Sequence, residues 1–342
     1  MQTTTKLTIA VICGLALTAC GGGGDDSGNG SSNDNSAAQI GGVPPGGDSS
    51  SGGSSSGNTL TFRYEALASV DDPMTGSTAS FLTQVNAEGA KGYRYLSDDG
   101  FSNDAISSIF VNDGTVSSYT YELIADPGNI PDLVIQANTE GAKGYRYEGE
   151  LMIGAANYSL YRQDNGSSAT YTYVADSVPT SATDWLVQAD GRGQSGYWLV
   201  SPIGYGSTES NLYMKNNASS TTYTYDALTP PASLADLLTQ LNSEGAKGYR
   251  AKGEMVIGGE EQWLYMKDQT QSATFTYLSD AVQGTSALFI NQANNYGAQG
   301  NAYFSDLVAG TTGTSMPVAS FYFKASNCSG FMCTALNPLI QN

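Results

Sequence analysis

The chain has 342 residues, a formal net charge of −18 and no histidine. This acidic balance argues against nucleic acid, which requires basic patches, and against electrostatic docking on anionic lipid. The lack of histidine removes the usual general base and the Ser-His-Asp and Cys-His forms of nucleophilic catalysis.

Residues 1–19 read as a targeting segment. Lys6 supplies a positive charge, and the apolar stretch Leu7–Leu17 is too short to span a bilayer. The following sequence, Leu17-Thr18-Ala19-Cys20, resembles the lipobox of bacterial lipoproteins. That resemblance implies cleavage before Cys20 and attachment of lipid to it, and Gly21 implies sorting to the outer membrane, in a periplasmic or surface-exposed position. A secretory signal without lipid is the alternative.

Residues 20–58 then consist mainly of Gly, Ser, Asn and Asp, with few apolar side chains. Such a segment cannot bury enough surface to offset its backbone entropy, so we expect a disordered tether behind the lipidated cysteine.

A heptapeptide recurs through the rest of the chain, most clearly as Glu244-Gly245-Ala246-Lys247-Gly248-Tyr249-Arg250. Its first glycine recurs every 52 residues, at Gly89, Gly141, Gly193, Gly245 and Gly297. A fixed period of this length indicates a repeat architecture. We therefore expect a repeat domain over 59–325 and a C-terminal tail over 326–342. The units of the repeat domain are about 59–117, 118–169, 170–221, 222–273 and 274–325.

The fourth unit gives the clearest reading of one repeat. Thr222–Tyr225 alternates polar and aromatic residues, which predicts a half-buried strand. In Ser233–Leu241 the leucines recur at helical spacing. The heptapeptide follows, and then two further strands lie over 249–257 and 262–267, separated by Gly258-Gly259. Each unit is thus predicted to be β-α-β-β, and the fold class α+β.

Both ends of the helix carry signals in every unit. A residue that can cap free amides precedes its apolar face: Ser77, Asn129, Ser181, Ser233 and Thr285. At the other end we expect the first glycine of the heptapeptide to stop the helix in a left-handed conformation. The aromatic pairs of the first strands are expected beneath the helices, although aromatic rows can also stack on sugars.

The spacing L-N-x-x-G-A-x-G-Y/W resembles a small bacterial βαββ family of unknown function, which brings no catalytic residues. We expect the third strand of each unit to pair with the first strand of the next. The first strand, near Thr61–Tyr64, would then complete the last unit and close a curved, propeller-like ring that resembles the pentein architecture. The alternative is an open array of five self-contained βαββ modules.

Three arginines at equivalent positions, Arg94, Arg146 and Arg250, are the candidate ligand-facing residues, with a small anion as ligand. Otherwise each belongs to a strand beside a local ion pair of little energetic value. Cys13 leaves with the signal and Cys20 takes the lipid, so Cys328 and Cys333 are expected to form a structural disulfide. No catalytic, metal or cofactor motif is present.

The sequence therefore predicts a lipid-anchored protein of the cell envelope whose repeat domain is a non-enzymatic binding or structural module. Besides the membrane, its expected partners are a protein, a glycan or a small anionic ligand. The alternative function is an envelope glycan hydrolase that uses paired carboxylates.

Overall fold

A computed structural model describes residues 60–309 and 317–336. Contacts divide the chain into Met1–Asn58 and Thr59–Asn342, and the second of these units, called the body below, is described by itself. The predicted signal segment, lipidated cysteine and tether lie outside the described residues. Within the described ranges, no helix is long and apolar enough to cross a membrane.

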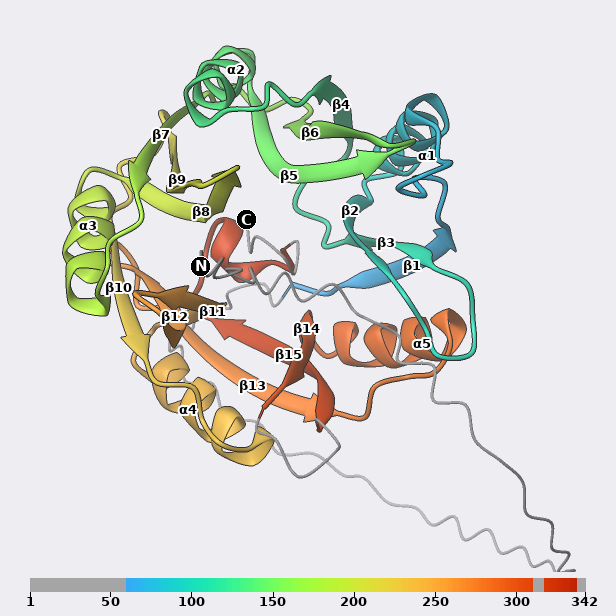
Figure 1. Ribbon diagram of the computed structural model, residues 1–342. Helices are drawn as coiled ribbons and strands as arrows, with labels where there is room; N and C mark the ends of the chain where they lie inside the picture. The colour runs from blue at the N-terminus through green and yellow to red at the C-terminus, as the bar shows by residue number, and fades with distance from the viewer. Residues whose placement is uncertain (1–59, 310–316, 337–342) are drawn as a thin grey trace, which may run out of the picture. The chain divides into compact units, whose positions relative to one another are not determined.

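The body contains five consecutive β-α-β-β units, as predicted (Figure 1). Unit 1 consists of β1 (Arg63–Ala68), α1 (Thr78–Ala90), β2 (Arg94–Asp99) and β3 (Ser107–Asn112). Units 2 and 3 consist of β4 (Tyr119–Ala125), α2 (Ile130–Ala142), β5 (Tyr145–Ile153), β6 (Ala156–Asp164), β7 (Tyr171–Ser177), α3 (Ala182–Gln194), β8 (Tyr197–Tyr205) and β9 (Thr208–Asn216). Units 4 and 5 consist of β10 (Tyr223–Leu228), α4 (Leu234–Ala246), β11 (Arg250–Ile257), β12 (Glu260–Asp268), β13 (Thr274–Asp280), α5 (Ser286–Gly297), β14 (Ala302–Val308) and β15 (Val318–Ser326). A short 3-10 helix, Phe331–Cys333, follows.

Each unit forms its own three-stranded antiparallel sheet, in which the third strand lies between the first and the second. The prediction that the third strand pairs with the next unit's first strand is therefore wrong. The helix returns the chain so that the second strand runs parallel to the first with one strand position free between them, and the hairpin fills that position. In the described part of the chain, no sheet closes into a barrel, and no sheet contains strands from two units.

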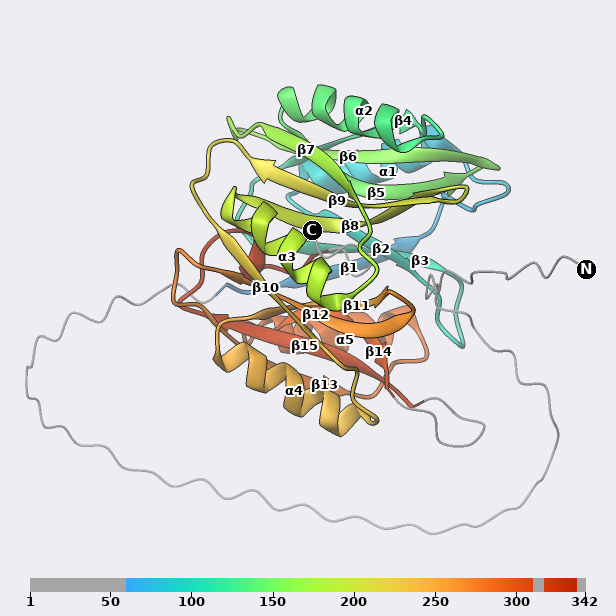
Figure 2. The same ribbon diagram turned by 60° about the vertical axis from the view of Figure 1, so that its left-hand side comes forward.

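The units instead touch through their helices. Each helix packs on the first strand of the following unit, and α5 packs on β1 in the same way (Figures 1 and 2). The backbone N–H of Phe62, before β1, donates to the carbonyl of Gly297 at 3.1 Å. In Figure 1 the five units follow one another around the red C-terminal segment.

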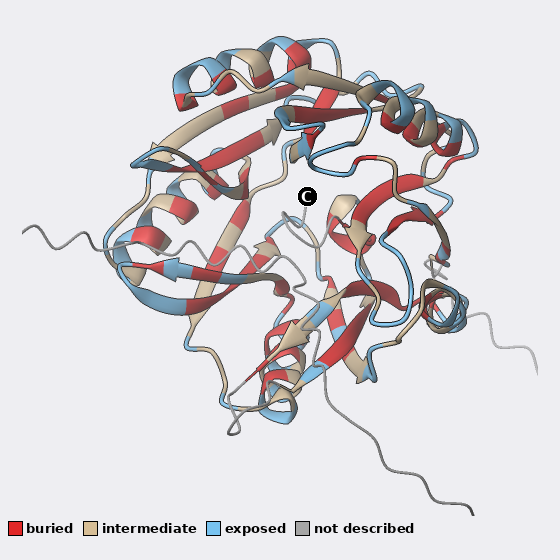
Figure 3. Ribbon diagram, turned by 45° about the vertical axis from the view of Figure 1, so that its right-hand side comes forward, coloured by how far each residue is buried: buried red, intermediate tan, exposed pale blue. Residues whose placement is uncertain are grey.

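The core lies between the helices and the sheets. Figure 3 shows buried positions facing inward on each helix and exposed ones facing out. The predicted aromatic rows belong to this core, because all ten of their side chains are buried: Phe62, Tyr64, Tyr119, Tyr121, Tyr171, Tyr173, Tyr223, Tyr225, Phe275 and Tyr277.

The predicted N-caps are confirmed in all five helices, since each cap side chain accepts a backbone N–H of the first turn. The predicted C-terminal stop is wrong. The first glycine of the heptapeptide lies inside the helix, and the left-handed residue is the second glycine, as at Gly248 with φ 92°. Instead, the first glycine allows close approach, since a Cβ on Gly89 would lie 2.5 Å from the carbonyl oxygen of Tyr119 in the next unit.

Candidate functional site

Two further contacts at each junction recur with the period. The tyrosine that ends each aromatic pair extends its hydroxyl under the preceding unit and accepts a backbone N–H, as Tyr121 does from Tyr95 at 2.9 Å. The same tyrosine's backbone is held by a helix side chain, with Asn86 Oδ1 accepting from the N–H of Tyr121 at 2.8 Å. The junction between units 5 and 1 has both contacts: Tyr64 accepts from Tyr303 at 2.7 Å, and Asn294 Oδ1 accepts from Tyr64 N–H at 2.7 Å.

The three predicted arginines lie at the start of their strands and are buried, with 3% of Arg94, 6% of Arg146 and 2% of Arg250 exposed. Arg94 and Arg146 point toward the C-terminal segment, at Ala335 and Phe331 respectively. The predicted local ion pairs are present in the same heptapeptides, between glutamate and lysine: Glu88–Lys91, Glu140–Lys143 and Glu244–Lys247. Arg250 is close enough to Arg94 for their charges to interact. The structure thus brings the predicted residues together, although each is engaged with the protein itself.

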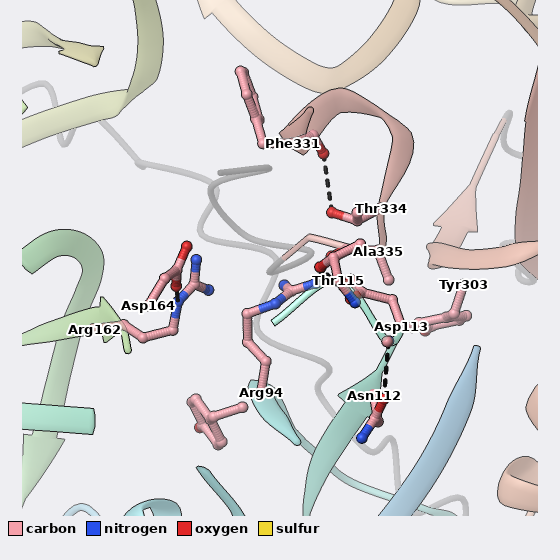
Figure 4. A network of polar contacts seen from close by, with 12 residues as sticks. Arg94, Asn112, Asp113, Thr115, Arg162, Asp164, Tyr303, Phe331, Thr334 and Ala335 are labelled. Carbon is pink, nitrogen blue, oxygen red and sulfur yellow. Dashed lines mark hydrogen bonds and ion pairs between the residues drawn. The ribbon is translucent and has the colours of Figure 1, made fainter. Parts of the chain in front are cut away.

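Arg94 connects unit 1 with the C-terminal segment (Figure 4). Its Nη2 lies 3.2 Å from Asp113 Oδ2 and donates to the carbonyl of Ala335. Burial tends to raise the pKa of Asp113, but Arg94 and the hydrogen bonds from Thr115 hold it below the usual value. This carboxylate therefore stays ionised and fixes the guanidinium.

Unit 2 places a chain of charges beside Arg94. Glu148 Oε1 lies 3.6 Å from Arg146 Nε and 3.1 Å from Arg162 Nη1. Arg162 Nε in turn lies 2.9 Å from Asp164 Oδ1. Glu148 is buried and Asp164 is half-buried, and their carboxylates offset the charges of the two arginines. This part of the centre is therefore an internal ion-pair network, as buried charges require.

Unit 4 contributes Arg250 and Lys252. The guanidinium of Arg250 lies 4.6 Å from the ring centre of Phe323. Burial, with a smaller contribution from Arg94, lowers the pKa of Arg250 to about 10 although Tyr277 opposes the shift. Lys252 Nζ donates to the carbonyl of Leu199 in unit 3 at 2.6 Å, and burial followed by Arg250 lowers its pKa well below the usual value.

Sequence reasoning missed how Glu148 and Lys252 reach the interior. The second strand of every unit has a β-bulge two residues after the arginine position, where the pairing register skips Leu96, Glu148, Val200, Lys252 and Phe304. A bulge changes the side to which a strand residue points. Simple alternation therefore gave no signal for these positions.

The predicted disulfide is confirmed: Cys328 and Cys333 are joined, with their Cα atoms 5.7 Å apart. Between them, Phe331 stacks on Trp198 at 4.6 Å between ring centres and meets the edge of Tyr223 at 6.3 Å. Arg146 lies 5.8 Å from the centre of the Phe331 ring. The C-terminal segment therefore covers the inner side chains of several units.

Several carboxyl groups lie close together at the end of the units away from the C-terminal segment, near the hairpins that connect the second and third strands. Tyr205 of unit 3 donates to Asp126 Oδ2 at 2.6 Å and to Glu150 Oε1 at 2.9 Å, both in unit 2. Burial, and then a hydrogen bond with Asp98, raise the pKa of Asp71 to about 7. One position of the second strand is acidic in four units, a recurrence that the sequence shows: Asp98, Glu150, Glu254 and Asp306.

The loop between β2 and β3 of unit 1 contacts unit 5. Asp104 Oδ2 accepts from Ser286 Oγ at 2.6 Å at the start of α5, and Asn103 N–H donates to the carbonyl of Gly284 at 2.9 Å. Among residues 60–309 and 317–336, no group of three or more His, Cys, Asp or Glu side chains is placed to hold a metal ion.

Comparisons with protein-family models, with curated proteins and with solved structures found no match for this chain.

Proposed function

We propose that this chain is a lipid-anchored protein of the cell envelope, attached to the outer membrane through Cys20, and that its body is a non-enzymatic structural or binding module. The lipobox-like sequence Leu17–Cys20 supports the anchor. Several acyl chains on one cysteine would give stable attachment, which a single chain does not.

One observation carries the non-enzymatic part: the chain's own segment Asn327–Leu336 lies against two of the repeated arginines, Arg94 and Arg146. Ala335, which accepts a hydrogen bond from Arg94, has no exposed surface, and Phe331 lies against Trp198 and Arg146. Charges used in this way hold units together and are not available to a substrate. A protein, glycan or small anionic ligand would then bind elsewhere on the body.

The alternative, a glycan hydrolase, has weaker support. Such enzymes place two carboxyl groups about 5–10 Å apart so that the sugar, and in some cases a water molecule, fits between them. Asp99 of unit 1 and Asp306 of unit 5 are near enough for their charges to interact, and burial followed by Asp306 raises the pKa of Asp99 to about 7. Two other carboxyl pairs of the described body, Asp71 with Asp98 and Asp126 with Glu150, hydrogen-bond to each other. Groups in direct contact leave no room for a glycosidic bond.

The body is further proposed to be a closed, pentein-like ring of five units rather than an open array. The contacts of unit 5 with unit 1 support closure, because α5 packs on β1 and the pairs Tyr64–Tyr303 and Asn294–Tyr64 match those at the other junctions. Closure of this kind proceeds through helix-to-strand packing and needs no shared sheet.

Membrane fractionation of Cys20→Ser tests the anchor. The unsubstituted chain is expected in the membrane fraction and the variant in the soluble fraction, with Cys13→Ser, inside the signal, as a matched control that remains in the membrane. Membrane retention of Cys20→Ser would refute lipid attachment.

Incubation of the purified body with envelope glycans tests the hydrolase. It is expected to release no products, and release above a heat-inactivated control would favour the hydrolase.

A further inference from the structure

One short segment, Asn327–Leu336, contacts every unit of the body. It continues β15 of unit 5, and its Ala335 carbonyl accepts from Arg94 of unit 1. Phe331 lies against Arg146 of unit 2 and Trp198 of unit 3.

The contact with unit 4 is also specific. Gln271 Oε1 accepts from the backbone N–H of Ser329 at 2.7 Å, and its Nε2 donates to the Ser329 carbonyl at 3.1 Å. Tyr223 of the same unit meets the edge of the Phe331 ring. A disulfide loop that stabilised only unit 5 would not make these contacts with units 1 to 4.

We propose that the Cys328–Cys333 loop is a redox-controlled clasp. The inner ends of the units are the ends at which their second strands begin, around Arg94, Arg146, Trp198, Arg250 and Ala302. When the disulfide is formed, the clasp holds these inner ends together, and when a dithiol reduces the disulfide, they separate more readily. The closed loop keeps Phe331 against Trp198, because a chain joined at both ends has few alternative conformations. After reduction the six-residue loop gains freedom, and the contacts of Phe331 and Ser329 must hold it alone.

The exposure of the loop allows this chemistry. Ser329 and Gly330 are exposed and Cys328 is half-buried, whereas Cys333 is only 4% exposed. A thiolate of the dithiol attacks the sulfur of Cys328, the S–S bond breaks, and Cys333 leaves as a thiolate. The second thiol of the reductant then resolves the mixed disulfide, so that two electrons pass to the protein, both cysteines become thiols and the reductant becomes a cyclic disulfide.

The five junction amides provide a direct readout. Each follows the arginine position of its unit and donates to a tyrosine hydroxyl of the next unit: Tyr95, Tyr147, Leu199, Ala251 and Tyr303. Their hydrogen exchange reports the opening of the inner ends one unit at a time.

The experiment measures residue-resolved amide exchange on the full-length protein, with and without a dithiol. Reduction is expected to raise exchange at Tyr95, Tyr147 and Leu199 by about tenfold or more. A tenfold rise corresponds to a loss of about 1.4 kcal/mol of protection. Cys328→Ser/Cys333→Ser should exchange at the reduced rate in both conditions, which also excludes effects of the reductant elsewhere.

Phe331→Ala tests the contribution of the Phe331 side chain without any redox change. It should raise exchange at Tyr147 and Leu199. Its matched control is Phe101→Ala, another half-buried loop phenylalanine, which packs at a single junction, 5.8 Å from Phe289. The control should affect Tyr303 and leave Tyr147 and Leu199 unchanged. A rise confined to residues 327–336 after reduction, or no rise, would overturn the clasp.

Discussion

The close approach at the first glycine of the heptapeptide can be tested within one helix. Substituting alanine for two glycines of that helix should change the free energy of unfolding in opposite directions. Gly191 and Gly193 both lie in α3. A Cβ on Gly191 would meet nothing within 4 Å, whereas one on Gly193 would overlap the carbonyl group of Tyr223 in unit 4, with the carbonyl carbon at 2.8 Å.

Gly191→Ala should therefore stabilise the protein by about 0.5–1 kcal/mol, the usual gain from alanine in a helix. Gly193→Ala receives the same gain, but α3 must move away from β10 to accommodate the methyl group. Overpacking of this kind costs about 1–3 kcal/mol, and here the neighbour is the backbone carbonyl of Tyr223, which cannot rotate aside. We expect a net loss of about 1 kcal/mol, which is the difference between the middle values of these two ranges.

Urea denaturation followed by circular dichroism measures both variants against the unsubstituted body. The expected order of midpoints is Gly191→Ala, then the unsubstituted protein, then Gly193→Ala, with similar m-values. If Gly193→Ala were as stable as Gly191→Ala, the glycine would not serve close packing between units, and the reasoning would fail.

Two further predictions concern buried charge. Arg94→Ala leaves Asp113 buried without its partner and should cost about 3–5 kcal/mol, of which Asp113→Asn in the same chain should restore part, as measured by urea denaturation. No recovery in the double variant would argue against the ion pair. The second concerns pH: burial and Asp98 raise the pKa of Asp71 to about 7 from the usual 3.8 of an aspartate, so between these two pH values the folded state holds a proton that the unfolded state has lost. Stability should fall as pH rises from about 4 to 7 and then level off. Because burial and Asp306 also raise the pKa of Asp99 to about 7, Asp71→Asn should reduce this slope and leave the part that Asp99 contributes. A slope unchanged by the substitution would assign the pH dependence to other groups.

The repeat, the order of elements and the core could be predicted from the sequence because they depend on local periodicity. The spacing of the leucines predicts the buried face of α4 from residues close in sequence. The same holds for the capping residues, which predict where each helix begins, and for the aromatic pairs, which predict the first strands. Strand pairing was not local in this sense. The link from β6 to β7 is short whether or not the two strands pair, and only packing of the helix on the next unit decides between the arrangements.

The roles of the glycines and arginines were harder to predict for a related reason. A glycine near a helix end suits both a left-handed stop and a close approach, and Gly245 and Gly248 divide these two roles between them. Asn86 and its equivalents recur three residues before the first glycine, so the signal for the junction was present without its meaning. The place of Arg94 depends on Ala335, 241 residues away along the chain.

The central claim is that unit 5 meets unit 1 through the same contacts as the other junctions. Tyr64→Phe and Tyr121→Phe test it most directly, because each removes one hydroxyl that accepts a buried backbone N–H, at 2.7 Å from Tyr303 and 2.9 Å from Tyr95. Leaving such a donor unsatisfied costs about 1–3 kcal/mol. Closure predicts similar losses in unfolding free energy for both variants, and a loss for Tyr121→Phe with none for Tyr64→Phe would contradict it.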